Sequence, residues 1–88
     1  MRKNLYMVYD LVAETLIGSV ILELTDAPAI RAFHDALRTK ESLLAQHPAD
    51  YQLVSLGELN METGVMVASD GYIVVATGQS WLEFTTSI

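Results

Sequence analysis

Two apolar stretches near the start of the chain have the pattern of β-strands. Asn4 to Asp10 contains five consecutive aromatic or aliphatic residues, and Leu16 to Leu24 is a second apolar run with Gly18 inside it. Successive side chains of a strand point to opposite faces, so both faces of the first run need cover. We predict a strand over each run, a turn or a bulged continuation over Leu11 to Thr15, and a bulge or close approach at Gly18.

The next stretch has the signals of an amphipathic helix. Thr25 or Asp26 can accept hydrogen bonds from the first-turn amides, and Pro28 suits a first turn. Apolar residues then recur at three- and four-residue spacing, which predicts one buried helical stripe: Ala29, Ile30, Phe33, Ala36 and Leu37. A short helical turn over Glu41 to Gln46 follows, and Pro48 ends it.

The second half of the chain is dominated by strand patterns. Tyr51 to Leu59 alternates, Asn60 to Gly64 reads as a hairpin loop, and Val65 to Ala68 returns as a strand. We expect a further turn over Ser69 to Gly71. Tyr72 to Ala76 has the strongest β character in the chain.

The tail, Trp81 to Ile88, is interpreted as a possible last strand that pairs across a subunit interface. The element order is then β-β-α-β-β-β with an optional sixth strand. The predicted fold class is α+β, a small antiparallel sheet covered by one amphipathic helix. We expect residues 1–88 to form a single domain.

Composition adds an expectation of self-association. The chain has 88 residues, is 51% hydrophobic and has a mean hydropathy of +0.30, which is more apolar surface than so small a protein can bury. We therefore expect a homo-oligomer whose interface includes the C-terminal apolar residues Tyr72, Ile73, Val75, Trp81 and Phe84. The chain has no cysteine and no apolar run of the length that spans a membrane, which suits a reducing cytoplasm without membrane contact.

Charge is spread unevenly along the chain. The net charge is −6, and from Glu41 onward there are six carboxylates and neither Lys nor Arg. Nucleic-acid affinity comes largely from phosphate neutralisation, so any DNA contact must use the N-terminal half. The candidate contact residues are Arg31, Arg38, Lys40, Arg2 and Lys3. The alternative is an ordinary solvated helix face.

Catalytic and metal-binding patterns are missing from the sequence. There is no cysteine nucleophile, no G-x-S-x-G elbow and no glycine-rich phosphate loop. His34 and His47, the two histidines, have a spacing that matches no metal motif. We expect no enzyme activity, no metal and no cofactor. Trp81 and Phe84 either stack on bases or pack in a core or interface.

One set of short runs resembles a known family. The runs are Ala29 to Phe33, His47 to Leu53, Leu56 to Glu58 and Thr63-Gly64, with Tyr9-Asp10 and Ala13-Glu14 before them. In this order they resemble the small nonstructural protein of gokushovirus-type microviruses, the tailless phages with circular single-stranded DNA. The resemblance covers roughly residues 6 to 64.

The resemblance implies a protein of the infected bacterial cytoplasm that is absent from the virion. Such a protein binds DNA or acts in single-stranded DNA synthesis during genome packaging, and the family has no catalytic residues to assign. The leading hypothesis is a non-enzymatic phage accessory protein that acts as an oligomer in viral single-stranded DNA synthesis or packaging, with or without direct contact to DNA. The alternative is a protein-only module that binds itself, a phage replication or packaging protein, or a host factor.

Overall fold

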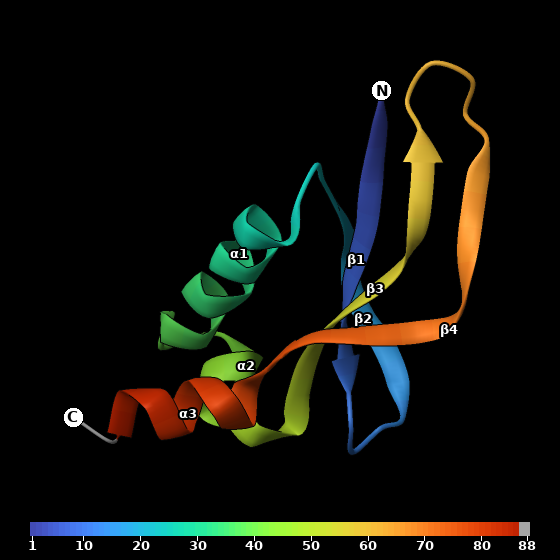
Figure 1. Cartoon of the computed structure of the whole chain (residues 1–88). Coiled ribbons are helices and arrows are strands. Elements are labelled where there is room, and N and C mark those ends of the chain that lie inside the picture. The colour runs from blue at the N-terminus through green and yellow to red at the C-terminus, as the bar shows by residue number, and fades with distance from the viewer. Residues whose placement is uncertain (87–88) are drawn as a thin grey trace.

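β1 (Arg2–Asp10) is the strand around which the sheet is built. It pairs antiparallel with β2 (Thr15–Glu23) on one side and with β3 (Tyr51–Asn60) on the other. β4 (Met66–Thr77) pairs antiparallel with the outer side of β3, so the strand order is β2-β1-β3-β4. The computed structural model, drawn in Figure 1, describes residues 1–86.

The helices all pack against one face of this sheet. They are α1 (Asp26–Arg38), α2 (Leu43–Gln46) and α3 (Gly78–Thr86), with a single 3₁₀ turn, η1 (Pro48–Asp50), before β3. Phe33 of α1, Leu44 of α2 and Trp81 of α3 pack in the same apolar cluster as Leu53 of β3. The predicted α+β class, with an antiparallel sheet covered by an amphipathic helix, is confirmed.

The alternation of side chains along β1 decides what the helices cover. Tyr6 is completely buried and Val8 packs beside it in the core, together with three buried residues of α1: Ala29, Phe33 and Leu37. The residues between them on β1 point to the other face. On that face the rings of Tyr9 and Tyr72 lie 4.7 Å apart, and Val54 on the intervening strand is fully buried.

The start of α1 is attached to the sheet by a side-chain hydrogen bond. Thr25 is the residue before the helix, but its side chain makes no capping hydrogen bond. Asp26 accepts a hydrogen bond from the Tyr6 hydroxyl instead, with an O–O distance of 2.5 Å. The predicted helix is confirmed, and its first acidic residue binds the sheet instead of the helix amides.

β4 corrects the prediction of two strands separated by a turn. Residues 60 to 65 do form the expected hairpin turn, in which Asn60 accepts hydrogen bonds from the amides of Glu62 and Thr63 at 2.9 and 3.2 Å. The predicted turn over Ser69 to Gly71 is instead a bulge inside one long strand. There the pairing register shifts, and Gly71 has a φ of +79°. A bulge keeps the chain in the same strand pair, whereas a turn would reverse it.

α3 corrects the prediction of a last strand over Trp81 to Ile88. Residues 78 to 86 form a helix, and Thr77 precedes it with its hydroxyl accepting a hydrogen bond from the Ser80 amide at 3.0 Å. This capping hydrogen bond satisfies a first-turn donor and favours a helix over a strand. The last two residues of the predicted strand, 87 and 88, lie outside the described part of the chain.

The sheet is longer than the layer of helices. The molecule measures 44 × 25 × 22 Å, and Figure 1 shows the N-terminus and the β3–β4 turn at the end of the sheet away from α3. Among residues 1–86, no helix is long and apolar enough to cross a membrane.

Candidate nucleic-acid interface

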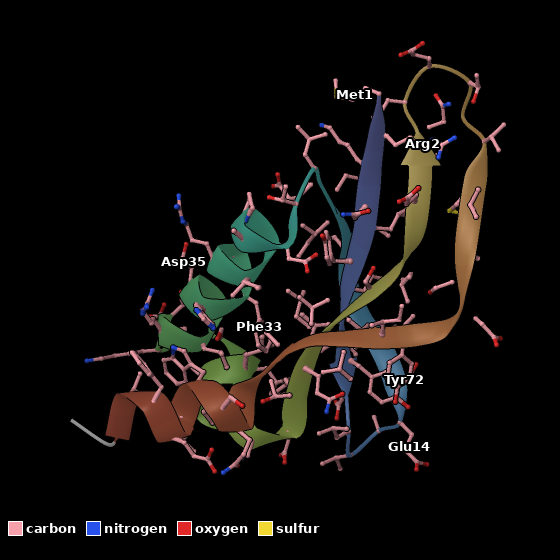
Figure 2. All side chains as sticks on the ribbon, in the orientation of Figure 1. Met1, Arg2, Glu14, Phe33, Asp35 and Tyr72 are labelled. Carbon is pink, nitrogen blue, oxygen red and sulfur yellow. The ribbon has the colours of Figure 1, made fainter. Side chains whose placement is uncertain are left out.

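α1 carries three basic residues on one outward stripe. Arg31, His34 and Arg38 follow one another at spacings of three and four residues, which places them along one side of a helix. The buried stripe of the same helix is formed by Ala29, Phe33 and Leu37. Both arginines are exposed and His34 is half-buried, and Figure 2 shows Phe33 on the sheet side of α1 and Asp35 on its outer side. We call Arg31, His34 and Arg38 the basic stripe.

The basic stripe remains accessible to a charged ligand. Arg38 forms an ion pair with Asp35 at 3.3 Å, and both side chains are more than half exposed. An exposed pair of this kind contributes about 0–1 kcal/mol and exchanges readily with solvent. Among residues 1–86, Arg31 has no carboxylate within ion-pair distance. Lys40, just after the helix, is also exposed.

An apolar groove lies beside the basic stripe, between α1, the end of β4 and α3. Its volume is about 470 Å³. Nine residues line it: Ile30, His34, Val74, Val75, Ala76, Thr77, Ser80, Trp81 and Phe84. Phe84 is 72% exposed, while Trp81 is half-buried and packs against the core. We call this space the α1–α3 groove, and His34 belongs both to it and to the basic stripe.

Trp81 has a buried polar atom with no hydrogen-bond partner among the described residues. The atom is the indole Nε1, and its N–H is a donor. Leaving such a group unpaired costs about 1–3 kcal/mol, and a phenylalanine in its place would avoid that cost. Packing in the core therefore does not by itself account for a tryptophan at this position.

The predicted DNA-contact residues fall into two separate groups. Arg31, Arg38 and Lys40 lie together on and just after α1. Arg2 and Lys3 lie at the start of β1, opposite the end of β3, where Arg2 approaches Glu58 at 3.7 Å. Figure 2 shows Arg2 beside the β3–β4 turn, away from the outer face of α1.

The predicted interface residues also divide. Tyr72 and Ile73 lie on β4, an edge strand, with 45% and 58% of their surfaces exposed. Val75, Trp81 and Phe84 line the α1–α3 groove instead. The prediction thus combined residues from two different surfaces.

Sequence reasoning missed that His34 and Ile30 share a groove with Trp81 and Phe84. The omission follows from the prediction of a strand over the tail, since a strand would not bring Trp81 and Phe84 to one side at helical spacing. The signal that was present is Thr77, three residues before Ser80, as a helix cap.

Three tyrosines have a clearly raised pKa. Burial is the main cause that raises the pKa of Tyr6, and its hydrogen bond to Asp26 raises it further. Burial also raises the pKa of Tyr9 and Tyr51. Among residues 1–86, no three His, Cys, Asp or Glu side chains gather in a way that could hold a metal ion.

These features define a small α+β protein that presents a basic helix stripe beside an aromatic groove. The model of the Phage ORF5 protein family matches residues 3–81, which covers all four strands and the helices up to the middle of α3. The chain therefore belongs to the Phage ORF5 protein family and is a phage protein. No curated protein and no solved structure matches it.

Proposed function

We propose that this phage protein is a non-enzymatic accessory factor that binds single-stranded DNA during viral DNA synthesis or packaging. It acts in the host bacterial cytoplasm as a homo-oligomer and is absent from the virion. The observation that carries the proposal is the basic stripe of α1, exposed beside an aromatic groove. The resemblance to gokushovirus-type microvirus proteins supports single-stranded DNA as the ligand, because the genomes of those phages are single-stranded.

The charge distribution favours one defined contact surface. The net charge of −6 repels phosphates over most of the molecule. Three of the five Lys and Arg residues lie on or just after α1: Arg31, Arg38 and Lys40. Binding is therefore expected to be weak overall and strongly dependent on salt.

The test is fluorescence anisotropy with an oligo(dT) at two salt concentrations. Replacing Arg31, Arg38 and Lys40 together by alanine should weaken binding and lower the salt slope by roughly two, at about 0.7 per lost phosphate contact. The matched control is the double variant Arg2→Ala and Lys3→Ala, which removes cations at the other end of the sheet. Equal losses in both variants would contradict the assignment to α1.

A second candidate function, a protein-only assembly module, is favoured by β4. This edge strand exposes apolar side chains on both of its faces and on the preceding turn: Val65, Met66, Val67, Tyr72, Ile73 and Val74. Long apolar edge strands invite pairing with another strand. The opposite edge, β2, exposes fewer large apolar side chains, namely Leu16 and Val20.

The exposed area is consistent with pairing between two copies. The chain exposes 5673 Å², whereas a monomeric protein of 9.7 kDa exposes about 5,100 Å². The excess of roughly 570 Å² approaches the area of about 800 Å² that each partner buries in a standard interface. The expected partner for β4 is therefore the β4 strand of a second copy.

Light scattering of the purified protein tests this pairing. The wild-type mass should be a multiple of 9.7 kDa, and Ile73→Lys should reduce it to that of one chain, because a charged edge strand resists pairing. Val20→Lys is the matched control, since Val20 is 49% exposed on the other edge strand, β2. A monomeric wild type, or an equal effect of Val20→Lys, would reject β4 as the interface.

A further inference from the structure

The α1–α3 groove combines two features that single-stranded nucleic acids require of a binding site. Phe84 and Trp81 provide aromatic rings in its lining, and His34, which also belongs to the basic stripe of α1, lines the same groove. Aromatic side chains stack on unpaired bases, while cations follow the phosphates. The two features come from segments more than forty residues apart in the sequence and meet only in the folded molecule.

We infer that the α1–α3 groove binds an unpaired nucleobase, stacked on Phe84 and Trp81, with the flanking phosphates on Arg31 and Arg38. This inference rests on the proposed function, binding of single-stranded DNA, and names the site and the part of the ligand that enters it. Stacking uses the flat aromatic face that every base has. The preference for particular DNA sequences should therefore be weak.

The groove has the size and the lining that a base needs. Its volume of about 470 Å³ lies within the range of small-molecule sites. Its lining is mostly apolar, with polar groups from His34, Thr77 and Ser80. The Thr77 hydroxyl accepts a hydrogen bond from the Ser80 amide and can still donate its own proton. The Thr77 and Ser80 hydroxyls and the His34 imidazole are therefore available to a base edge.

Charge favours a nucleic acid over an apolar protein segment as the occupant. Among residues 1–86, no carboxylate lines the groove, although the chain has eleven Asp and Glu residues and a net charge of −6. Glu83 precedes the groove residue Phe84 in the sequence, and its carboxylate accepts a hydrogen bond from Gln79, one turn earlier in α3. Asp35 of α1 does not line the groove, and a phosphate can replace it in its exposed ion pair with Arg38. Phosphates are therefore expected to contact Arg31 and Arg38 beside the groove.

The spacing of the cations fits a strand that crosses the groove. Arg31 and Arg38 are seven residues apart, which corresponds to about 10 Å along a helix axis. His34 lies between them and also lines the groove. A base that enters beside His34 would have its two neighbouring phosphates on opposite sides, each within the reach of one arginine.

Trp81 is the only tryptophan of the chain, so its fluorescence reports directly on the groove. The test compares an oligo(dT) with an abasic oligonucleotide of the same number of phosphates, at low salt. The oligo(dT) should quench Trp81 and bind roughly five- to a hundredfold more tightly, the range expected from stacking of one base. The abasic oligonucleotide should bind weakly through its phosphates and leave the fluorescence unchanged.

Variants of Phe84 provide an independent readout. Phe84 is 72% exposed, so its replacement is not expected to disturb the fold. Phe84→Ala should lower the affinity for oligo(dT) several-fold without changing the affinity for the abasic oligonucleotide, and Phe84→Tyr should retain both. Leu43→Ala, which shortens an exposed apolar side chain on α2 outside the groove, is the matched control.

The outcomes separate this inference from the proposed function. Equal affinities for the two oligonucleotides, with no change in Trp81 fluorescence, would overturn the groove and leave phosphate binding by α1 intact. A Phe84→Ala variant that lowers the mass in solution, and not the affinity for oligo(dT), would identify the groove as an interface between copies and overturn the inference. Failure of both oligonucleotides to bind at low salt would overturn the proposed function together with the groove.

Discussion

Gly78 decides, at the scale of a single residue, how closely α3 approaches the rest of the molecule. It is buried at the junction of β4 and α3, and a Cβ on it would overlap the backbone carbonyl oxygen of Pro48 in η1. Backbone atoms cannot move aside as a flexible side chain can. Only glycine therefore permits this contact, which holds one wall of the α1–α3 groove in place.

Gly78→Ala should accordingly destabilise the protein by about 1–3 kcal/mol, as other overpacking substitutions do. Urea denaturation followed by Trp81 fluorescence measures the free energy of unfolding. The control is Gln79→Ala, an exposed change in the same turn that removes only the hydrogen bond to Glu83. An unchanged midpoint in Gly78→Ala would show that α3 can shift without cost.

Two elements, β4 and α3, differ from what the local pattern of the chain predicted. Ser69 to Gly71 has turn composition, and in β4 those residues form a bulge, closed by the Ser69 hydroxyl donating to the Gly71 carbonyl at 2.6 Å. Trp81 to Phe84 has strand composition, and in α3 those residues follow a Thr77 cap. In each segment the residue types are compatible with two local structures. Contacts with the neighbouring backbone decide which of the two forms.

The helical structure of the tail determines whether the candidate site can form. As a strand, the tail would have continued the sheet, and its aromatic residues would have had no relation to α1. As a helix that contacts η1, β3 and β4, it packs Trp81 against the core cluster that contains Phe33. The element that was predicted wrongly is thus the one that completes the candidate site.

Proton binding gives a prediction for the whole molecule. Burial is the main cause that raises the pKa of Tyr6, Tyr9 and Tyr51 in the folded protein. Tyrosines of the unfolded chain have their ordinary pKa of about 10. The folded state keeps its phenol protons at a pH where the unfolded state has lost them. The contribution of these three tyrosines to the free energy of unfolding is therefore fully present below about pH 10. It is lost as the pH rises through their pKa values in the folded state.

Denaturation midpoints measured from neutral to strongly alkaline pH should show this loss beginning near pH 10, and near-ultraviolet absorbance should show delayed ionisation of tyrosine in the folded protein. In Tyr6→Phe the loss should be smaller, because one raised pKa is removed, although the hydrogen bond to Asp26 is removed as well. Constant stability across this range would contradict the assignment of burial as the cause.

The sequence by itself determined the elements whose signals are local. The spacing of Ala29, Phe33 and Leu37 specifies α1 and its buried stripe, and Asn60 to Gly64 specifies the hairpin turn. The apolar runs locate β1, β2 and β3, including the irregularity at Gly18, where φ is +78°. These features depend on residues within a few positions of one another, which is why periodicity and turn composition reveal them.

Tertiary structure alone decided which distant residues share a surface. In the folded protein, β1 is an inner strand of the sheet, and Arg2 and Lys3 lie on it, away from α1. Phe84 and His34 line the same groove although they are fifty residues apart in the chain. Such neighbours follow from strand order and from one close backbone contact, Gly78 against Pro48. Neither depends on a short-range pattern, so the aromatic and basic halves of the candidate site could be recognised separately in the sequence but not joined.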